Sequence, residues 1–523
     1  MYQILALAVF WAATTTLAYC PDYTTYAEEY HGPFSSGTYN LSYQRPSSEC
    51  RNFSSQSVEN TIIRLKSVIS DPDLYRLFEN SYPNTLDTAI KWHGYASNST
   101  DEELTFIITG DINAMWLRDS ANQLQSYLSL LNYSASNDSI ASLYRGAINL
   151  QSRYINTSPH CNAFQPPTES GLSPDVNSYG LDDTVTPAFS NQTVYECKYE
   201  LDSLAAFLEI SSNYYNTTKD ITFFKKYQWV STVETILNVA ESLIVGTYAD
   251  NGSVNTSPYT FTRETTSGTE TLDNSGIGNP VSANGLVRSA FRPSDDATIY
   301  QLFIPANMMF ARYLESASLI MSSISNQTTL AQRMRTLATS IRSAIEEYGI
   351  INDAKYGKIY AYEIDGYSSH NVMDDANIPS LLAAPFFGYL DVNDSTYQST
   401  RNVLLSKANP YFMRGPVINA IGGPHEGFGY AWPMASIVRI LTSSNDTEIM
   451  STLKEILGST AGLGLIHESI NTFNASDYTR QWYGAVSFFI LIHNLSISSM
   501  REYANEAYVQ VFMGERIVWA DDT

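Results

Sequence analysis

The chain has 523 residues, and its 30 Lys and Arg against 53 Asp and Glu give a net charge of −23. Such an acidic chain lacks the basic surface that binding to nucleic acid or to anionic lipid requires. Hydrophobic residues make up 44% of the sequence, so the chain can bury a large core and is not disordered. Charged residues make up only 16%, and this balance is typical of a soluble, secreted protein.

The first residues have the form of a secretory signal. Residues 4–13 are apolar, and the small residues Thr16 and Ala18 precede a cleavage site, which predicts a signal peptide over residues 1–18. The run is shorter than the ~20 residues of a bilayer span, so we expect an extracellular protein without a membrane anchor after cleavage. No Lys or Arg precedes the run, which leaves an uncleaved anchor as the alternative.

Four cysteines and many sequons fit the same compartment. Cys20, Cys50, Cys161 and Cys197 allow three pairings, and the nearest neighbours in sequence predict Cys20 with Cys50 and Cys161 with Cys197. Asn-x-Ser/Thr sequons recur from one end of the chain to the other, which predicts a glycoprotein. No Cys-x-x-Cys occurs, so a zinc or thioredoxin-like site has little support.

The order of elements predicts one large, mainly helical domain. Residues 19–55 are rich in turns and are expected to form an N-terminal extension packed on the surface of a catalytic domain over residues 56–523. A β-prone piece from Gly357 to Tyr362 predicts a short hairpin. Loops over residues 155–195 and 250–297 are long enough to suggest function. Apolar residues at helical spacing predict helices near residues 58–69, 117–128, 143–154, 201–208, 230–245, 299–323, 328–348, 432–442, 447–457 and 483–503.

The first cluster of polar and aromatic residues is GDINAMWLRDS at residues 110–120. Within one helical turn, Trp116 offers a flat ring, Arg118 a planar set of donors and Asp119 a carboxylate. A ring stacks on the C–H face of a sugar while the two charged groups bind its hydroxyls. The alternative is a buried Trp beside a local ion pair.

The second cluster, ECKYELD at residues 196–202, gathers Glu196, Glu200 and Asp202 at the start of a helix. Like charges raise the pKa of one carboxyl, as a general acid requires. A helix N-terminus has the opposite effect, so Asp202 would need burial or an acidic neighbour to stay protonated. The alternative is that Asp202 only caps the helix.

Three further clusters complete the set. FRPSDD at residues 291–296 offers Arg292 and Asp296 as sugar ligands, or Ser294 and Asp295 as caps of a following helix. GGPHEGFGYAWP at residues 422–433 contains glycines that would expose His425, Tyr430 and Trp432. Residues 466–482 contain Glu468, Arg480 and Trp482.

Other chemistries lack their motifs. Neither His-Glu pair, at residues 425–426 and 467–468, has the second His that a zinc protease requires. The sequence also lacks a G-x-S-x-G elbow, a Walker loop and a Rossmann Gly-rich turn. Carboxylates, arginines and aromatic residues remain, and they are typical of a glycosidase site in which two carboxyls do the chemistry.

The motifs GDINAMWLRDSANQ, KYELDSL, FRPSDDATIYQLFIPANMM, GPHEGFGYAWPM and HES…DYTRQWYG, in this order, resemble glycoside hydrolase family 125. The resemblance runs from about residue 55 to the C-terminus and implies an (α/α)6 barrel. It also implies an inverting exo-α-1,6-mannosidase that needs no metal or other cofactor. Asn113 and Ile470 stand where the family pattern leads us to expect Pro and Phe, which could reshape the pocket.

By motif position, the resemblance implies that Asp202 is the general acid and Glu468 the general base, with Glu426 as a rival for the base. The two catalytic carboxyls of an inverting enzyme stand ~6.5–9.5 Å apart, with room for the attacking water. The substrate would be a mannose-containing oligosaccharide or glycan. Residues expected around its terminal mannose are Trp116, Arg118, Asp119, Arg292, Asp296, His425, Trp432 and Arg480.

Two other functions stay open at this stage. One is another inverting (α/α)6 glycosidase that acts on α-glucosides. The other is a non-catalytic glycan-binding protein, which would have no need of both Asp202 and Glu468.

Overall fold

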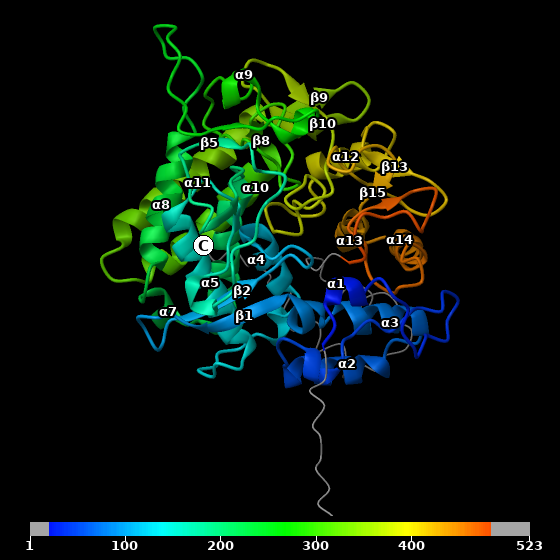
Figure 1. Ribbon diagram of the computed structural model, residues 1–523. Helices are drawn as coiled ribbons and strands as arrows, with labels where there is room; N and C mark the ends of the chain where they lie inside the picture. The colour runs from blue at the N-terminus through cyan, green and yellow to red at the C-terminus, as the bar shows by residue number, and fades with distance from the viewer. Residues whose placement is uncertain (1–19, 483–523) are drawn as a thin grey trace, which may run out of the picture.

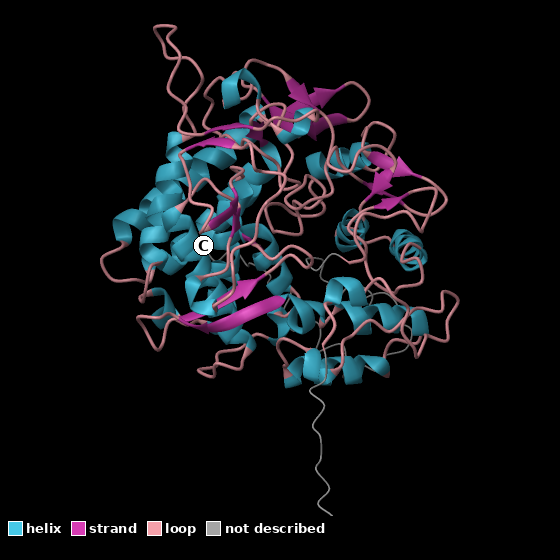
Figure 2. Cartoon of the chain, in the orientation of Figure 1, coloured by secondary structure: helices cyan, strands magenta, loops and turns pink. Residues whose placement is uncertain are grey.

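The computed structural model describes residues 20–482, in which helices predominate and strands are short (Figures 1 and 2). The fold is therefore helix-dominated, as the sequence predicts. The helices are α1 (Tyr23–Tyr26), α2 (Gln56–Lys66), α3 (Pro72–Ser81), α4 (Leu117–Gln125), α5 (Ile140–Thr157), α6 (Leu201–Thr218), α7 (Ile221–Phe224), α8 (Trp229–Ser242), α9 (Asp273–Gly276), α10 (Ile304–Ser322), α11 (Thr328–Tyr348), α12 (Ser395–Leu404), α13 (Pro433–Leu441) and α14 (Asp446–Gly458).

The strands pair locally in antiparallel sheets of two or three. The regions predicted as long functional loops contain the paired strands β5 and β7, and β4 and β6, which form a sheet with β3. The strands are β1 (Ile90–Tyr95), β2 (Glu103–Ile107), β3 (Met115–Trp116), β4 (Ala163–Phe164), β5 (Thr184–Thr186), β6 (Val194–Glu196), β7 (Thr260–Thr262), β8 (Leu302–Phe303), β9 (Ile350–Asp353), β10 (Gly357–Tyr360), β11 (Glu363–Ile364), β12 (His370–Asn371), β13 (Phe412–Arg414), β14 (Asn419–Ile421), β15 (Tyr430–Ala431) and β16 (Ile470–Asn471).

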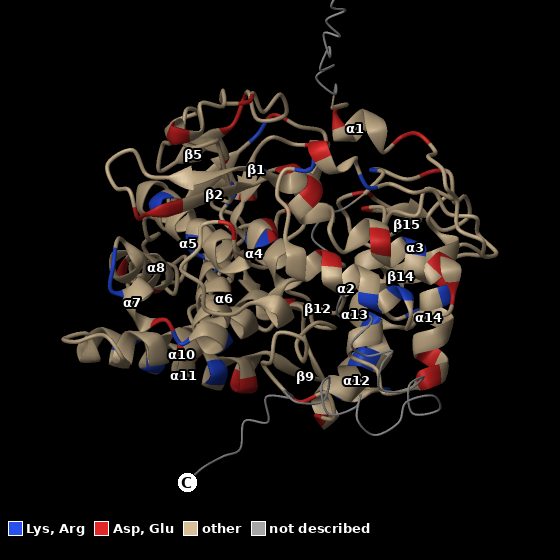
Figure 3. Ribbon diagram, turned by 90° about the horizontal axis from the view of Figure 1, so that it is seen from below, with Lys and Arg blue, Asp and Glu red and all other residues tan. Residues whose placement is uncertain are grey.

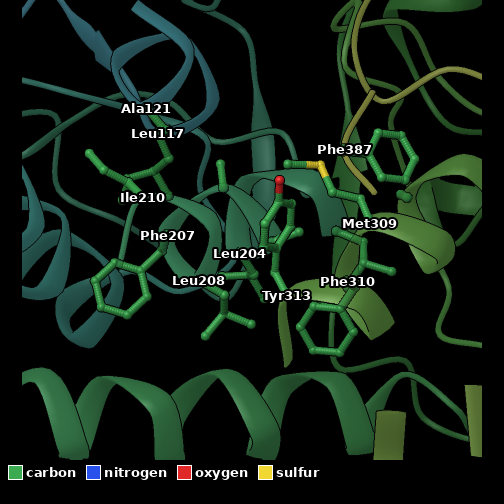
Figure 4. Packing of buried hydrophobic residues seen from close by; sticks show 14 of the residues in the cluster. Leu117, Ala121, Leu204, Phe207, Leu208, Ile210, Met309, Phe310, Tyr313 and Phe387 are labelled. Carbon is green, nitrogen blue, oxygen red and sulfur yellow. The ribbon is translucent and has the colours of Figure 1, made fainter. Parts of the chain in front are cut away.

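The centre of the fold is formed by α6 and α10, which are buried along most of their length. Helices that are apolar on all sides are the ones that a core can surround. Figure 4 shows Leu204 and Leu208 of α6 beside Met309 and Tyr313 of α10. Helix α4 packs on α6, and helix α11 packs on α10. The contact between α4 and α6 brings the N-termini of these two helices close together.

Most predicted helices are confirmed. The apolar residues that predicted α2, α5, α8 and α11 are among the buried residues of these helices. The predicted hairpin at residues 357–362 is also confirmed, as β9 paired with β10. The helix predicted over residues 483–503 lies outside the described residues. The prediction missed α3 and α12, although Asp71 and Asp394 cap them through their side chains.

One helix start was placed too early. The helix predicted from residue 299 begins at Ile304, because Leu302 and Phe303 form β8 and pair with β11. Ser294 and Asp295 therefore cap no helix. They lie in a tight turn in which the Asp295 N–H donates to the Arg292 carbonyl and Phe291 bridges to Ala297.

The N-terminal segment binds to parts of the chain far away in sequence (Figure 1). Arg45 is buried and forms ion pairs of 2.7 Å with both Glu59 and Asp87. The N–H of Ser42 donates to the carbonyl of Gly462 over 2.9 Å. Both predicted disulfides are present, Cys20–Cys50 and Cys161–Cys197.

Acidic and basic residues are interspersed when the molecule is viewed from below (Figure 3). Among the helices of residues 20–482, none has both the length and the apolar character that crossing a bilayer would require.

Candidate active site

A cavity of about 730 Å³ is formed where segments from much of the chain converge. The start of α4, the two long loops near residues 177–198 and 263–270, the turn at 293–295 and the segments at 425–432 and 468–482 all contribute to its wall. Such a volume exceeds the needs of a single small ion and suits a ligand of sugar size. The pairing of β5 with β7 joins the two long loops into one wall.

The structure brings most of the predicted site residues to this cavity. Those that line it are Trp116, Arg118, Asp119, His425, Trp432, Glu468 and Arg480. Three others lie behind the wall: Asp202, Arg292 and Asp296 are buried and do not line the cavity. Their positions support indirect roles through neighbouring residues and do not support contact with a sugar.

Trp116, Arg118 and Asp119 are positioned by a short strand that leads into a helix. Strand β3 pairs with β4, which fixes Trp116 at the N-cap of α4. Arg118 and Asp119 follow on the first turn of α4 and are buried. The indole Nε1 of Trp116 is buried and has no hydrogen-bond partner within the described protein, so it can donate to a bound hydroxyl.

Arg118 is surrounded by carboxyls. Its Nη1 lies 2.8 Å from Oε2 of Glu200 and 3.4 Å from Oδ2 of Asp202, and its Nη2 lies 3.9 Å from Oδ1 of Asp295. Asp119 is also 3.9 Å away. One guanidinium cannot balance four ionised carboxylates in a buried site, so the arrangement favours protonation of part of the cluster.

Asp202 occupies the first turn of α6, while Glu200 is the N-cap residue. Burial raises the pKa of Asp202 to about 7 against the opposing charge of Arg118. Burial also raises the pKa of Glu200 well above its usual range. The sequence therefore indicated correctly that a carboxyl of this segment has a raised pKa, but neither Asp202 nor Glu200 lines the cavity.

Asp295 lines the cavity, whereas its motif position predicted only a helix cap. Its backbone has a φ of 64°, which is uncommon for a residue other than glycine and often marks a functional site. The side chain is 22% exposed, in contrast to the buried Asp202. Sequence reasoning could have found it only through the FRPSDD motif, where it stands beside Asp296.

Arg292 and Asp296 support this turn and the segment opposite. The Nε of Arg292 donates to Glu363 over 2.7 Å, and Ser294 donates to Asp375 over 2.8 Å, which fixes both ends of the turn. Asp296 lies 3.8 Å from Nδ1 of His425. Burial lowers the pKa of His425, but the negative charge of the nearby Asp296 outweighs this effect and raises that pKa to about 10. His425 is therefore an imidazolium at neutral pH.

Glu468 lies on the cavity wall and is held by two neighbouring side chains. Thr479 Oγ1 donates to its Oε2 over 3.0 Å, and Arg480 makes a close ion pair with its Oε1. Arg480 also pairs with Asp111, with 2.7 Å between Nε and Oδ2. Glu426 lines the cavity too, and burial together with the charge of Glu468 raises its pKa.

Trp482 closes another side of the cavity against Gly110. A Cβ at Gly110 would lie 3.0 Å from Nε1 of Trp482, and the φ of 149° there is unfavourable for other residues. The glycine in GDINAMW thus permits the close approach of this ring.

An ion network fixes the outer wall. Arg263 pairs with Asp183 and Glu270 over 2.7 Å each and with Glu196 over 3.2 Å. Because Asp183 and Arg263 come from different loops, this network joins the two loops into one surface. Tyr179 lies on the same wall and is 83% exposed, so its ring is available to a ligand that extends from the cavity.

Glu270, Asp296 and His425 place one donor atom each within 4.8 Å of one another, which raises the question of a metal ion. The chemistry of these residues does not fit one. His425 is protonated through Asp296 and cannot offer a lone pair at neutral pH. Glu270 is already paired with Arg263 at 2.7 Å and with Lys198 at 3.3 Å.

The cavity is lined by carboxyls together with tryptophan, arginine and imidazolium groups, and this set of residues is typical of a glycoside hydrolase. The comparisons with known proteins agree. The family of metal-independent α-mannosidases, glycoside hydrolase family 125, matches residues 71–489 of this chain. The chain belongs to this family, and its class is that of an α-mannosidase.

Two relatives illustrate the range of the similarity. The chain is 47% identical over 467 residues to the meiotically up-regulated gene 157 protein of Schizosaccharomyces pombe, covering 89% of this chain and 90% of that protein. It is also similar to a metal-independent α-mannosidase of Streptococcus pneumoniae, solved in a non-productive complex with α-1,6-mannobiose. That match has a TM-score of 0.74 and 29% identity, and it covers 85% of this chain and 99% of the bacterial one.

Proposed function

We propose that this protein removes terminal α-1,6-linked mannose from oligosaccharides or glycans by a single inverting displacement. The observation that carries the proposal is the cavity itself, which presents Asp295 and Glu468 together with the aromatic and charged residues of the family motifs. The α-1,6-mannobiose complex of the bacterial relative supports this choice of linkage.

The general base of the proposed reaction is Glu468. It lines the cavity, and its carboxyl is oriented by Thr479 and Arg480. In the reaction a water oxygen forms a bond to C1 of mannose and gives one proton to Glu468. A carboxylate held by two donors is well placed to orient that water, because its rotation is restricted.

The general acid is Asp295, which replaces Asp202 as our candidate. A general acid must come within hydrogen-bond reach of the glycosidic oxygen, and only Asp295 of these two lines the cavity. As the C1–O bond breaks, its electron pair goes to the leaving oxygen, and that oxygen takes the acid's proton. Asp202 stays in the account as a buried neighbour that contacts Arg118.

The terminal mannose would be bound by the residues between the two carboxyls. Trp116 and Trp432 offer ring faces, and Arg118, Asp119 and the His425 imidazolium offer charged partners for its hydroxyls. In this proposal the cavity holds the terminal mannose, so the enzyme acts from the end of the glycan. The wall formed by the two long loops, with Tyr179 and Arg263, would contact the leaving group.

We extend the proposal to architecture and location. The proposed architecture is the (α/α)6 barrel that the family resemblance implies, and the packing of α4 on α6, of α6 on α10 and of α10 on α11 supports it. Two disulfides and the apolar residues 4–13 support secretion with removal of residues 1–18, because disulfides persist in oxidising compartments.

A panel of linkage-defined disaccharides tests the proposed function. The purified protein is incubated with α-1,2-, α-1,3-, α-1,4- and α-1,6-mannobiose and with isomaltose, and the released sugars are measured. Mannose release confined to the α-1,6 compound is expected. Glucose release from isomaltose would move the protein to the α-glucosidase alternative, and binding without any hydrolysis would make it a glycan-binding protein.

A further inference from the structure

The buried carboxyl of Glu200 has no role in the reaction described so far, although it belongs to the group around the acid. It is the N-cap residue of α6 and is 1% exposed. Its Oε2 accepts hydrogen bonds from Arg118 Nη1 over 2.8 Å and from Ser203 Oγ over 3.0 Å. A buried carboxyl with this many contacts has one fixed orientation.

That orientation faces Asp295. The Nδ2 of Asn162 donates to Glu200 Oε1 over 3.2 Å and to Asp295 Oδ1 over 3.0 Å, so one amide joins the two carboxyls. Two ionised carboxylates that share one amide and one guanidinium repel each other, so this arrangement favours a pair that holds one proton.

The charges that face the pair come from every neighbouring element. Arg118 on α4 is in contact with both carboxyls. Asp202 on α6 and Asp119 on α4 add negative charge around the same guanidinium, at 3.4 Å and 3.9 Å from it. Glu196 lies on β6, and its Oε2 accepts from the shared Asn162 over 3.4 Å.

Positive charge also reaches the cavity side of the pair. Burial would raise the pKa of Asp295, but the charges of Arg118 and Lys198 outweigh it and lower that pKa to about 2. The proton therefore resides on the buried member in the free protein, since burial and the charge of Asp295 keep the pKa of Glu200 well above its usual range. Taken alone, Asp295 would be ionised and could protonate nothing.

We propose that Glu200 is a positioning residue that holds the proton of the proposed general acid. One proton is shared between the two carboxyls, and it shifts to the cavity-facing oxygen of Asp295 as negative charge develops on the leaving oxygen. Asp295 then gives that proton to the leaving oxygen while the attacking water gives one to Glu468. After product release, exchange with solvent returns a proton to the pair and removes one from Glu468. This inference rests on the proposed function.

The test is the variant Glu200→Gln, assayed on two α-mannosides that differ in their leaving group. On α-1,6-mannobiose the leaving alkoxide needs a proton, so we expect kcat to fall on the order of 10²-fold. On 2,4-dinitrophenyl α-mannoside the leaving phenolate needs none, so we expect kcat within about threefold of wild type. Glu209→Gln is the matched control: Glu209 is another buried glutamate of α6, bonded to Tyr313, and does not line the cavity.

The pH profile gives a second readout. In Glu200→Gln the pair loses its proton carrier, while the charges of Arg118 and Lys198 remain and an amide can still donate to Asp295, so the pKa of Asp295 stays low. The alkaline limb of kcat on mannobiose should therefore move to lower pH. A purely structural role would slow both substrates equally and leave the limb in place, and this result would overturn the role of Glu200. Wild-type protein inactive on both substrates would overturn the proposed function and this inference with it.

Discussion

Arg118 lines the cavity and Asp202 lies behind it, with 3.4 Å between Nη1 of Arg118 and Oδ2 of Asp202. The guanidinium therefore stands between the carboxyl that the motif position indicated and the space where a sugar would bind. Asp295 approaches the same guanidinium from the side of the cavity, at 3.9 Å. The account of catalysis depends on which of these two carboxyls reaches the glycosidic oxygen.

The first prediction separates the two candidates for the acid. Asp295→Asn keeps the shape of the side chain and removes its transferable proton, so hydrolysis of α-1,6-mannobiose should slow by ~10²–10⁴-fold while ligand binding persists. Asp202→Asn should retain more activity, because that carboxyl acts only through Arg118. Initial rates and calorimetric binding of mannobiose measure both. An active Asp295→Asn beside an inactive Asp202→Asn would return the acid to Asp202.

The second prediction concerns the base. In Glu468→Gln the amide cannot accept the proton of the attacking water, so we expect turnover to fall by ~10²–10⁴-fold on any mannoside, including one with a good leaving group. Glu426→Gln is the comparison, since Glu426 lines the same cavity next to His425. An inactive Glu426→Gln with an active Glu468→Gln would exchange their roles.

Chelation should leave the enzyme active. His425 is protonated and Glu270 is paired with two cations, so the one group of possible ligands within residues 20–482 does not suit a metal ion. We expect equal rates before and after dialysis against EDTA, and no stoichiometric metal in elemental analysis. Loss of activity that Ca²⁺ or Zn²⁺ restores would contradict this prediction.

The stability contributed by His425 should depend on pH in a defined direction. Its pKa rises from 6.5 to about 10 on folding, because Asp296 outweighs burial. The contribution is fully present below pH 6.5 and is lost as pH rises towards about 10. The difference in free energy of unfolding between wild type and His425→Gln should therefore shrink across this range, as measured by urea titration. A difference that grows with pH would reverse the assignment.

Arg45 should matter for stability and not for chemistry. Arg45→Met leaves the buried Asp87 with only the longer contact of 3.7 Å to Arg51, and breaking a buried ion pair costs up to about 3–5 kcal/mol. Chemical denaturation measures the loss, and Asp87→Leu in the same chain should recover part of it. The exposed pair Lys226–Asp101 is the control, and Lys226→Met should give no measurable change. Equal effects of Arg45→Met and Lys226→Met would show that burial is unimportant here.

Much of the fold was predictable because its helices carry their own signals. The spacing of Val58, Ile62 and Leu65 reappears as the buried face of α2. Helix α3 was also readable, since Asp71 and Pro72 form a capped start, but its apolar stripe is short. The strand β8 could not be predicted from local sequence, because Leu302 and Phe303 form a strand only by pairing with β11, which is far away in sequence.

The site was predictable as a set of segments and less so residue by residue. All five motifs reach the cavity or its immediate support, yet successive residues of a helix point about 100° apart. The direction of the Asp202 side chain therefore depends on the rotation of α6, which its packing on α10 decides. Glu200 precedes the helix with an extended backbone, so helical spacing does not predict its direction. Asp295 reaches the cavity through a left-handed turn that no periodicity reveals.

The anomer of the sugar released first shows whether the protein is an inverting mannosidase. Wild-type protein is mixed with α-1,6-mannobiose, and proton NMR spectra are recorded over the first minutes, before mutarotation equilibrates the product. We expect β-mannose to appear first and α-mannose later, because water attacks C1 opposite the leaving group. Initial release of α-mannose, or no release of mannose at all, would contradict this expectation.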